Sequence, residues 1–181
     1  MTYTDMLIRI GLTLVLSAAI GFDREMRHKP AGLKTHIFVG LGSTMFMLVS
    51  LYLYYMYGDE AKTLDPGRIA AQVVTGIGFL GAGTIIQSRG SVRGLTTAAS
   101  LWAVAGIGLA VGAGMYAISI TLAAVIIMVF LATNYFFDAM GHSIEEIEAQ
   151  KRRLENRIRD LKKKKTPKKK KKTEKKKRSG K

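Results

Sequence analysis

Few side chains in the first 150 residues could bind an ion or a partner, and three of them are consecutive. Asp23, Arg24 and Glu25 place two carboxylates two residues apart. Because Mg²⁺ in proteins keeps several waters and takes one or two carboxylates, this pair could hold a hydrated magnesium ion. Arg27 and Lys29 lie in the same stretch, however. Internal salt bridges are therefore the favoured interpretation, and the sequence predicts no metal site.

A second group of polar residues surrounds the start of an apolar segment. Asp65 precedes Pro66, an arrangement typical of a helix start, where a carboxylate caps free backbone N–H groups. Arg68 follows, and Gln72 lies about one turn further into the segment. A buried amide in hydrocarbon needs a partner, so Gln72 should face protein or water. Two interpretations stay open: capping with a surface ion pair, or a polar cavity lined by Arg68 and Gln72.

The sequence does not arrange these groups for catalysis. The three histidines are scattered, and there is no H-E-x-x-H motif and no cysteine. The run Gly76–Gly81 matches the G-x-G-x-x-G dinucleotide pattern. No strand is predicted before it and no acidic residue follows about 20 positions later, so we reject a nucleotide site. We expect neither an enzyme nor a bound cofactor.

The distribution of charge shows which elements must position these side chains. Uncharged stretches of 24, 20 and 44 residues begin after Lys34, Arg68 and Arg93. A transmembrane helix needs about 20 apolar residues, and the longest stretch suits two helices joined at residues 112–114. The first apolar segment contains only Arg9, which is near enough to one end to reach the headgroups. The sequence therefore predicts an all-α polytopic membrane protein with five transmembrane helices, at about 6–22, 36–57, 69–87, 95–111 and 115–137.

Basic residues in the short connections predict the orientation of these helices. Cytoplasmic loops carry an excess of Lys and Arg. The stretches 23–35 and 88–94 and the segment after residue 137 are basic, whereas the other side is not. We expect the N-terminus outside and the C-terminus in the cytoplasm. This orientation brings Arg93 to the same side as Asp23 and Glu25, and we hypothesise that it pairs with these two carboxylates.

Small residues form stripes along the third and fourth predicted helices. Lipid provides little hydrophobic drive between helices, so close backbone approach at small residues supplies the contact. We expect the two stripes to pack against each other, although either could instead be the face of a dimer. The glycine-rich run 78–83 could also break the helix, as helices do at some transporter ion sites. The predicted packing positions are Gly76, Gly78, Gly81, Gly83, Ala99, Ala103 and Gly106.

The C-terminal residues differ sharply from the rest of the chain. Residues 151–181 contain 19 Lys and Arg and three acids, a net charge of +16, whereas the whole chain carries +15. We predict a transmembrane domain at 1–140, an amphipathic cytoplasmic helix at 141–165 and a disordered Lys-rich tail at 166–181. The tail should bind anionic lipid headgroups of the cytoplasmic leaflet. Nucleic acid is the weaker, salt-sensitive alternative.

Three blocks of the sequence resemble the MgtC/SapB family of bacterial membrane proteins. They are GFDRE and KPAGLKT in residues 21–35, DPGRIAAQVVTGIGFLGAGTI in residues 65–85, and VRGLTTAASLW with AGIG in residues 92–108. The resemblance implies a multi-pass protein of the bacterial inner (plasma) membrane. Members of the family are tied to growth in scarce magnesium and, in intracellular pathogens, to survival in macrophages. One branch is linked to restraint of the F-type ATP synthase.

The chain departs from the better-known members of that family at two places. Many of them carry a folded cytoplasmic domain where this chain has a helix and a Lys-rich tail, and Ser91 stands where some have Asn. The leading hypothesis is a regulator that acts on another membrane protein complex, alone or as a homo-oligomer. The alternative is a transporter or channel for Mg²⁺ or another cation. A transporter should need its intramembrane polar groups, chiefly Gln72, Thr75 and Thr96.

Overall fold

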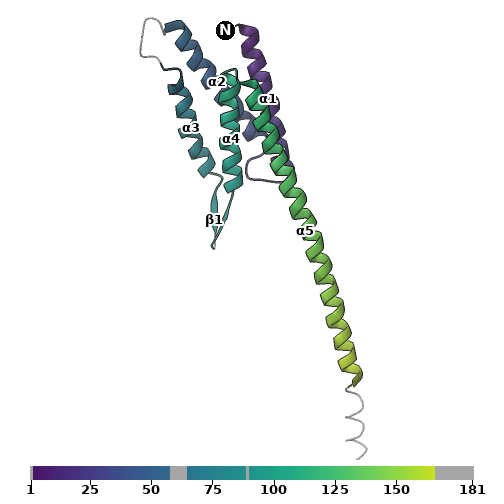
Figure 1. Ribbon diagram of the computed structural model, residues 1–181. Coiled ribbons are helices and arrows are strands. Elements are labelled where there is room, and N and C mark those ends of the chain that lie inside the picture. Colours follow the sequence, from purple (N-terminus) through teal and green to yellow (C-terminus); the bar gives the residue numbers. More distant parts are fainter. Residues whose placement is uncertain (1, 58–64, 89, 166–181) are drawn as a thin grey trace, which may run out of the picture. The chain divides into compact units, whose positions relative to one another are not determined.

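A computed structural model of the chain describes residues 2–57, 65–88 and 90–165 (Figure 1). Within these residues the chain is predominantly helical, as the sequence predicts. The elements in order are α1 (Tyr3–Met26), α2 (Leu33–Tyr57), α3 (Gly67–Ala82), β1 (Ile86–Ser88), β2 (Ser91–Arg93), α4 (Leu95–Gly112) and α5 (Tyr116–Lys165).

Four of the described helices are long and apolar enough to cross a membrane. They are α1, α2, α4 and the Tyr116–Phe137 part of α5, and they correspond to four of the five predicted spans. The remaining predicted span is α3, which has 16 residues. At about 1.5 Å per residue α3 is about 24 Å long, shorter than a hydrocarbon core of about 30 Å.

The third predicted helix, 69–87, ends at Ala82 because a β-hairpin follows it. β1 and β2 pair antiparallel, with Ile86 opposite Arg93. Gly94 then starts α4 with a φ of +91°, and a Cβ there would collide with the Thr84 carbonyl oxygen. Glycine alone tolerates both the left-handed backbone and this contact. The length of an uncharged run does not reveal such a hairpin, so the helix predicted through residue 87 is corrected here.

The chain divides into two compact units, Met1–Leu131 and Ala132–Lys181. α5 belongs to both and runs without a break past residue 140, where the sequence analysis placed a domain boundary. The predicted amphipathic helix at 141–165 is the C-terminal part of α5. The predicted Lys-rich tail at 166–181 lies outside the described residues.

Within the first unit, α2 and α4 lie at the centre. α2 contacts α1, α3 and α4, and α4 also contacts α1 and α3. In Figure 1 the start of α1 and the end of α2 lie at the same end of this unit, which we call the N-terminal end. β1 lies at the opposite end, which we call the hairpin end. α1, α4 and α5 share a hydrophobic core made of Ile20, Val104, Ile107, Val111, Ala123 and Phe130.

Glycines on α2 and α4 allow the closest contacts between helices. An ideal Cβ on Gly40 would lie 2.9 Å from the Cβ of Ser17 on α1. One on Gly108 would lie 2.9 Å from the Cβ of Ser43 on α2, and Gly112 is enclosed in the same way. Real Cβ atoms essentially never come that close, so the backbones of α1, α2 and α4 meet where no side chain would fit.

The predicted packing of α3 against α4 occurs at Gly81. This residue is buried, and a Cβ on it would lie 3.5 Å from the Ala98 Cβ on α4. Among the described residues, no further atom lies within 4 Å of the same position on Gly76, Gly78 or Gly106. For these three the expected contact within one chain is therefore corrected.

The other predicted packing positions are also away from the interior. Ala99 is exposed, Ala103 is partly buried, and Gly83 follows the end of α3. The fully packed face of α4 instead includes Leu101, Val104 and Ile107. Because α4 carries small residues at three- and four-residue spacings on both faces, the period predicts a helix but does not identify its buried side.

Candidate functional site

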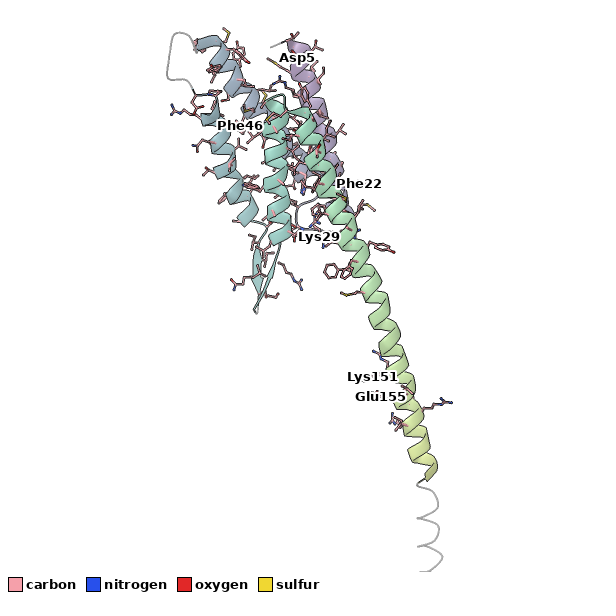
Figure 2. The ribbon with its side chains drawn as sticks, viewed as in Figure 1. Asp5, Phe22, Lys29, Phe46, Lys151 and Glu155 are labelled. Atoms are coloured by element: carbon pink, nitrogen blue, oxygen red, sulfur yellow. The ribbon has the colours of Figure 1, made fainter. Side chains whose placement is uncertain are left out.

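The acidic and basic residues at the end of α1 form a partly buried ion cluster. Arg27 Nε lies 3.1 Å from Asp23 Oδ1, and Arg24 Nη1 lies 3.9 Å from Asp23 Oδ2. Arg24 is 4% exposed, and its guanidinium carbon lies 4.4 Å from the centre of the Phe130 ring on α5. Figure 2 labels Lys29, which follows this cluster in the connection to α2. The predicted internal salt bridge is present at Asp23.

Glu25 has a different role from Asp23. Its Oε2 accepts a hydrogen bond from the Leu33 N–H at 3.0 Å, which caps the first turn of α2. The two carboxylates thus bind separate protein groups. In the part of the chain that the structure describes, neither forms an ion pair with Arg93, which is exposed at the end of β2. The hypothesised pairing with Arg93 is corrected, because Asp23 Oδ1 pairs with Arg27 and Glu25 binds the Leu33 N–H.

His36 joins α2 to α4 in the interior. The residue is fully buried; its Nδ1 lies 2.7 Å from the Gly32 carbonyl oxygen and its Nε2 lies 3.0 Å from Ser100 Oγ. Ser100 Oγ also lies 2.8 Å from the Thr97 carbonyl oxygen. The sequence does not reveal this contact, because a partner 64 residues away has no local sequence signal.

Buried hydroxyls extend the line of polar contacts from His36 toward the N-terminal end. Together these contacts are called the polar seam. Thr44 Oγ1 donates to the Gly108 carbonyl oxygen at 2.8 Å and lies 2.7 Å from Thr13 Oγ1. Ser17 Oγ donates to the Thr13 carbonyl oxygen. Sequence reasoning missed these residues. The available signal was the four-residue spacing of small polar residues on α1 (Thr13, Ser17), which is typical of close helix contacts in membranes.

Arg9 closes the N-terminal end of the seam. Its Nη1 donates to the Gly112 carbonyl oxygen at 2.5 Å and its Nε donates to Tyr116 Oη at 3.2 Å. Gly112 ends α4, so the guanidinium satisfies a carbonyl that has no partner within its own helix. The expectation that Arg9 extends to the lipid headgroups is corrected, since the end of α4 offers nearer acceptors.

The polar residues at the start of α3 meet α2 at a small cavity. Asp65 Oδ1 accepts from the Gly67 N–H at 2.7 Å, but the N-cap of α3 is Pro66, so the prediction of Asp65 as the N-cap is corrected by one position. Arg68 and Gln72 both line a cavity of about 370 Å³, together with Ser50 of α2. Among the described residues Asp65 forms no ion pair with Arg68, whereas the cavity lined by Arg68 and Gln72 is present. Thr96 is not part of this cavity and is exposed in the first turn of α4.

A larger groove of about 740 Å³ lies between the same two helices. Gln72 lines both spaces, whereas the rest of the larger one is mostly apolar. Its lining includes Lys34, Phe38, Gly42 and Phe46 of α2 and Gly76 of α3.

The buried polar groups of the described helices are better suited to holding helices together than to binding a metal ion. No group of three His, Cys, Asp or Glu residues that could hold a metal ion occurs among the described residues. The buried polar groups are mainly hydroxyls bonded to carbonyls within the helices, with one imidazole and one guanidinium.

Comparison with known proteins agrees with the resemblance seen in the sequence. The family model of the MgtC family matches residues 10–138. The chain is 48% identical over 117 residues to YhiD of Escherichia coli (strain K12), covering 64% of this chain and 54% of YhiD. It is 41% identical over 114 residues to protein SapB of Bacillus subtilis (strain 168), covering 62% and 49%.

A third relative extends the match. The chain is 42% identical over 150 residues to protein MgtC of Salmonella typhimurium (strain LT2), covering 81% of this chain and 60% of that protein. The chain thus spans between about half and three fifths of the length of these curated relatives. No solved structure matches it.

Proposed function

The chain belongs to the MgtC family, and on that premise we propose that it is a multi-pass inner-membrane protein that regulates another membrane protein complex. It acts without enzymatic turnover. The conditions in which it acts are magnesium limitation or a change in membrane energetics.

Five membrane spans, with the N-terminus outside and the C-terminus in the cytoplasm, are part of this proposal. α3 supports a fifth span because it packs beside α2 and α4 and runs from the N-terminal end to the hairpin end (Figure 1). In this orientation Arg24, Arg27 and Lys29 lie on the cytoplasmic side, in agreement with the positive-inside rule.

The observation that carries the regulatory proposal is that the carboxylates at the hairpin end are already engaged. Asp23 pairs with Arg27, and Glu25 caps α2 through the Leu33 N–H. Among the described residues Asp23 Oδ2 has no hydrogen-bond partner, but it is buried and Arg24 Nη1 lies 3.9 Å from it, so a divalent cation would have to displace a guanidinium to bind there. It would also meet the buried guanidinium of Arg24, which repels it. A protein that acts by contact with a partner needs no such ligands.

We assign the partner to the exposed face of α4. Ala99, Trp102 and Gly106 recur at spacings of three and four, so they share one face of the helix. Trp102 is 59% exposed, and among the described residues no atom crowds a Cβ on Gly106. Small residues beside an aromatic ring let a second transmembrane helix approach closely and pack on the ring. A second copy of the chain is the alternative occupant, which would make the protein a homo-oligomer.

The experiment is growth in scarce magnesium of a strain that lacks its own copy and carries a variant. Gly11→Leu is the matched control for Gly106→Leu, because Gly11 on α1 is also exposed and uncrowded. We expect Gly106→Leu to lose both the growth benefit and the co-purifying complex at unchanged protein level, and Gly11→Leu to keep both. An unimpaired Gly106→Leu variant would contradict the assignment of this face.

Cation transport is the second candidate function. Gln72 lines both spaces between α2 and α3, where an amide oxygen could replace part of a hydration shell. The name given to the relative YhiD proposes magnesium transport for that protein. Saturable Mg²⁺ flux into liposomes, lost in Gln72→Leu and kept in Gly106→Leu, would establish transport here. The regulatory proposal requires flux no greater than that of empty liposomes.

For the basic segment 151–181, whose last 16 residues lie outside the described part of the chain, the proposed partner is anionic lipid. A net charge of +16 should attract it to headgroups with about 1 kcal/mol per Lys near the surface. This attraction should weaken as salt shortens the Debye length. Release of the segment from anionic nanodiscs by added RNA at physiological salt would favour nucleic acid instead.

A further inference from the structure

The groove between α2 and α3 has the length of one membrane leaflet. It begins at Lys34 and Thr35 and extends along α2 to Phe46, which Figure 2 labels. The twelve steps between Lys34 and Phe46 correspond to about 18 Å of helix. One leaflet contributes half of a hydrocarbon core of about 30 Å. Its volume, about 740 Å³, lies within the range of about 300–1,000 Å³ that is usual for small-molecule sites.

The groove is lined by two glycines and by large apolar side chains. Gly42 and Gly76 line it, and among the described residues no atom lies within 4 Å of a Cβ built on either. The apolar side chains of Phe38, Phe46 and Leu80 also line it, each more than half exposed. A transmembrane helix about 10 Å across would be held off by these large side chains, whereas a single hydrocarbon chain can lie between them.

The charge of the groove is confined to one end. Of the described residues that line the groove, Lys34 is the one that is charged, and Thr35 follows it in the sequence. A cation at one end of an apolar groove complements an amphiphile that has an anionic headgroup and a hydrocarbon tail. A phosphate ester at the membrane interface has that chemistry and is abundant there.

We infer that this groove binds one anionic phospholipid from the leaflet at the hairpin end. One acyl chain occupies the groove as far as Phe46, and the phosphate contacts Lys34. The site is independent of the proposed function, because a regulator and a transporter could each hold such a lipid. It also differs from headgroup attraction to the basic segment, since apolar contacts with an acyl chain are not weakened by salt whereas attraction to surface charge is.

The test is native mass spectrometry of the full chain released from nanodiscs of palmitoyl-oleoyl phosphatidylglycerol or phosphatidylcholine at 0.5 M salt. Wild-type protein should retain one phospholipid and prefer phosphatidylglycerol. Gly76→Leu should fill the groove without touching protein atoms at its Cβ and should lose most of the retained lipid. Gly78→Leu, on the same helix but outside the groove, is the matched control and should retain it.

Lys34→Gln tests the headgroup contact separately. It should reduce the preference for phosphatidylglycerol by about fivefold, which is what about 1 kcal/mol per lysine near the surface corresponds to. The inference is overturned if Gly76→Leu and Gly78→Leu retain lipid equally, or if wild-type protein retains none. A change in dimer fraction rather than in bound lipid for Gly76→Leu would mean that a second copy occupies the groove, which also overturns it.

Discussion

His36 Nε2 lies 3.0 Å from Ser100 Oγ, and this contact ties α2 to α4 in a buried part of the bundle. With a neutral ring, Nδ1–H donates to the Gly32 carbonyl oxygen and Nε2 accepts the Ser100 proton. The same proton is then unavailable to the Thr97 carbonyl oxygen at 2.8 Å. The imidazole and a carbonyl of α4 thus compete for one hydroxyl.

Removing that hydroxyl should weaken the bundle by a modest amount. We expect Ser100→Ala to lower the free energy of unfolding by about 1 kcal/mol, the usual scale for hydrogen bonds between transmembrane helices. Unfolding in mixed detergent micelles measures it. The control is Thr121→Ala, whose exposed hydroxyl bonds within α5 to the Ala117 carbonyl oxygen at 2.9 Å. Equal losses in the two variants would show that His36 gains nothing from Ser100.

Two glycines on α4 should respond to alanine with opposite signs. Alanine favours a helix interior over glycine by about 1 kcal/mol, so Gly106→Ala, at an uncrowded position, should be neutral or stabilising. Gly108→Ala places a Cβ against the Gly40 carbonyl and the Ser43 Cβ, and should cost about 1–3 kcal/mol. Melting temperatures of the two variants give the comparison. A stabilised Gly108→Ala would contradict the close contact of α2 and α4.

The position of Arg9 can be tested through its two acceptors. Arg9→Lys can still reach the Gly112 carbonyl but cannot hold Tyr116 Oη in the same geometry, so we expect partial loss of stability. Arg9→Met should lose more. A double-mutant cycle of Arg9→Met with Tyr116→Phe should give a coupling energy of about 0.5 kcal/mol or more. If Arg9→Lys is fully neutral and the coupling is zero, the guanidinium lies among lipid headgroups instead.

Substitutions at the hairpin end distinguish the observed ion cluster from the hypothesised one. Asp23→Ala should cost about 3 kcal/mol, because it leaves the buried Arg24 without its neighbouring carboxylate. Arg93→Glu should change stability by less than about 0.5 kcal/mol, as is usual at exposed sites. Chemical unfolding of both variants tests this. Strong destabilisation by Arg93→Glu that is rescued by Asp23→Arg would restore the cross-bundle pair.

The sequence predicts most helices well because charge is costly in lipid. The uncharged stretches after Lys34 and Arg93 contain α2, α4 and the first part of α5. The same argument gave a wrong end for α3, because the uncharged stretch after Arg68 continues past Ala82 through β1, so no charge marks the end of the helix. The lengths of the other helices could be predicted from composition. The backbone turn at Gly94 could not, because it depends on one close contact with Thr84.

Contacts between helices were less accessible to prediction. The hydrogen bond from the Gly67 N–H to Asp65 is local and follows from adjacent residues, although the helix starts one position later than the sequence predicts. The contact between Gly108 and Gly40 depends on which face of α4 turns inward, and small residues occur on both faces. Arg9 was placed near the headgroups because its acceptor, the last carbonyl of α4, is not visible from residues around position 9.

The buried hydroxyls also constrain how the protein enters the membrane. Ser17, Ser43 and Ser119 each donate to the carbonyl one turn earlier in their own helix. A helix whose hydroxyls bind its own carbonyls can enter the bilayer as a single helix, before a neighbouring helix is present. Thr44 differs, because its acceptor is Gly108 in a helix synthesised later. Before α4 arrives, the Thr44 hydroxyl can donate to Thr13 Oγ1 on α1, and the arrival of α4 then supplies the Gly108 carbonyl as its acceptor.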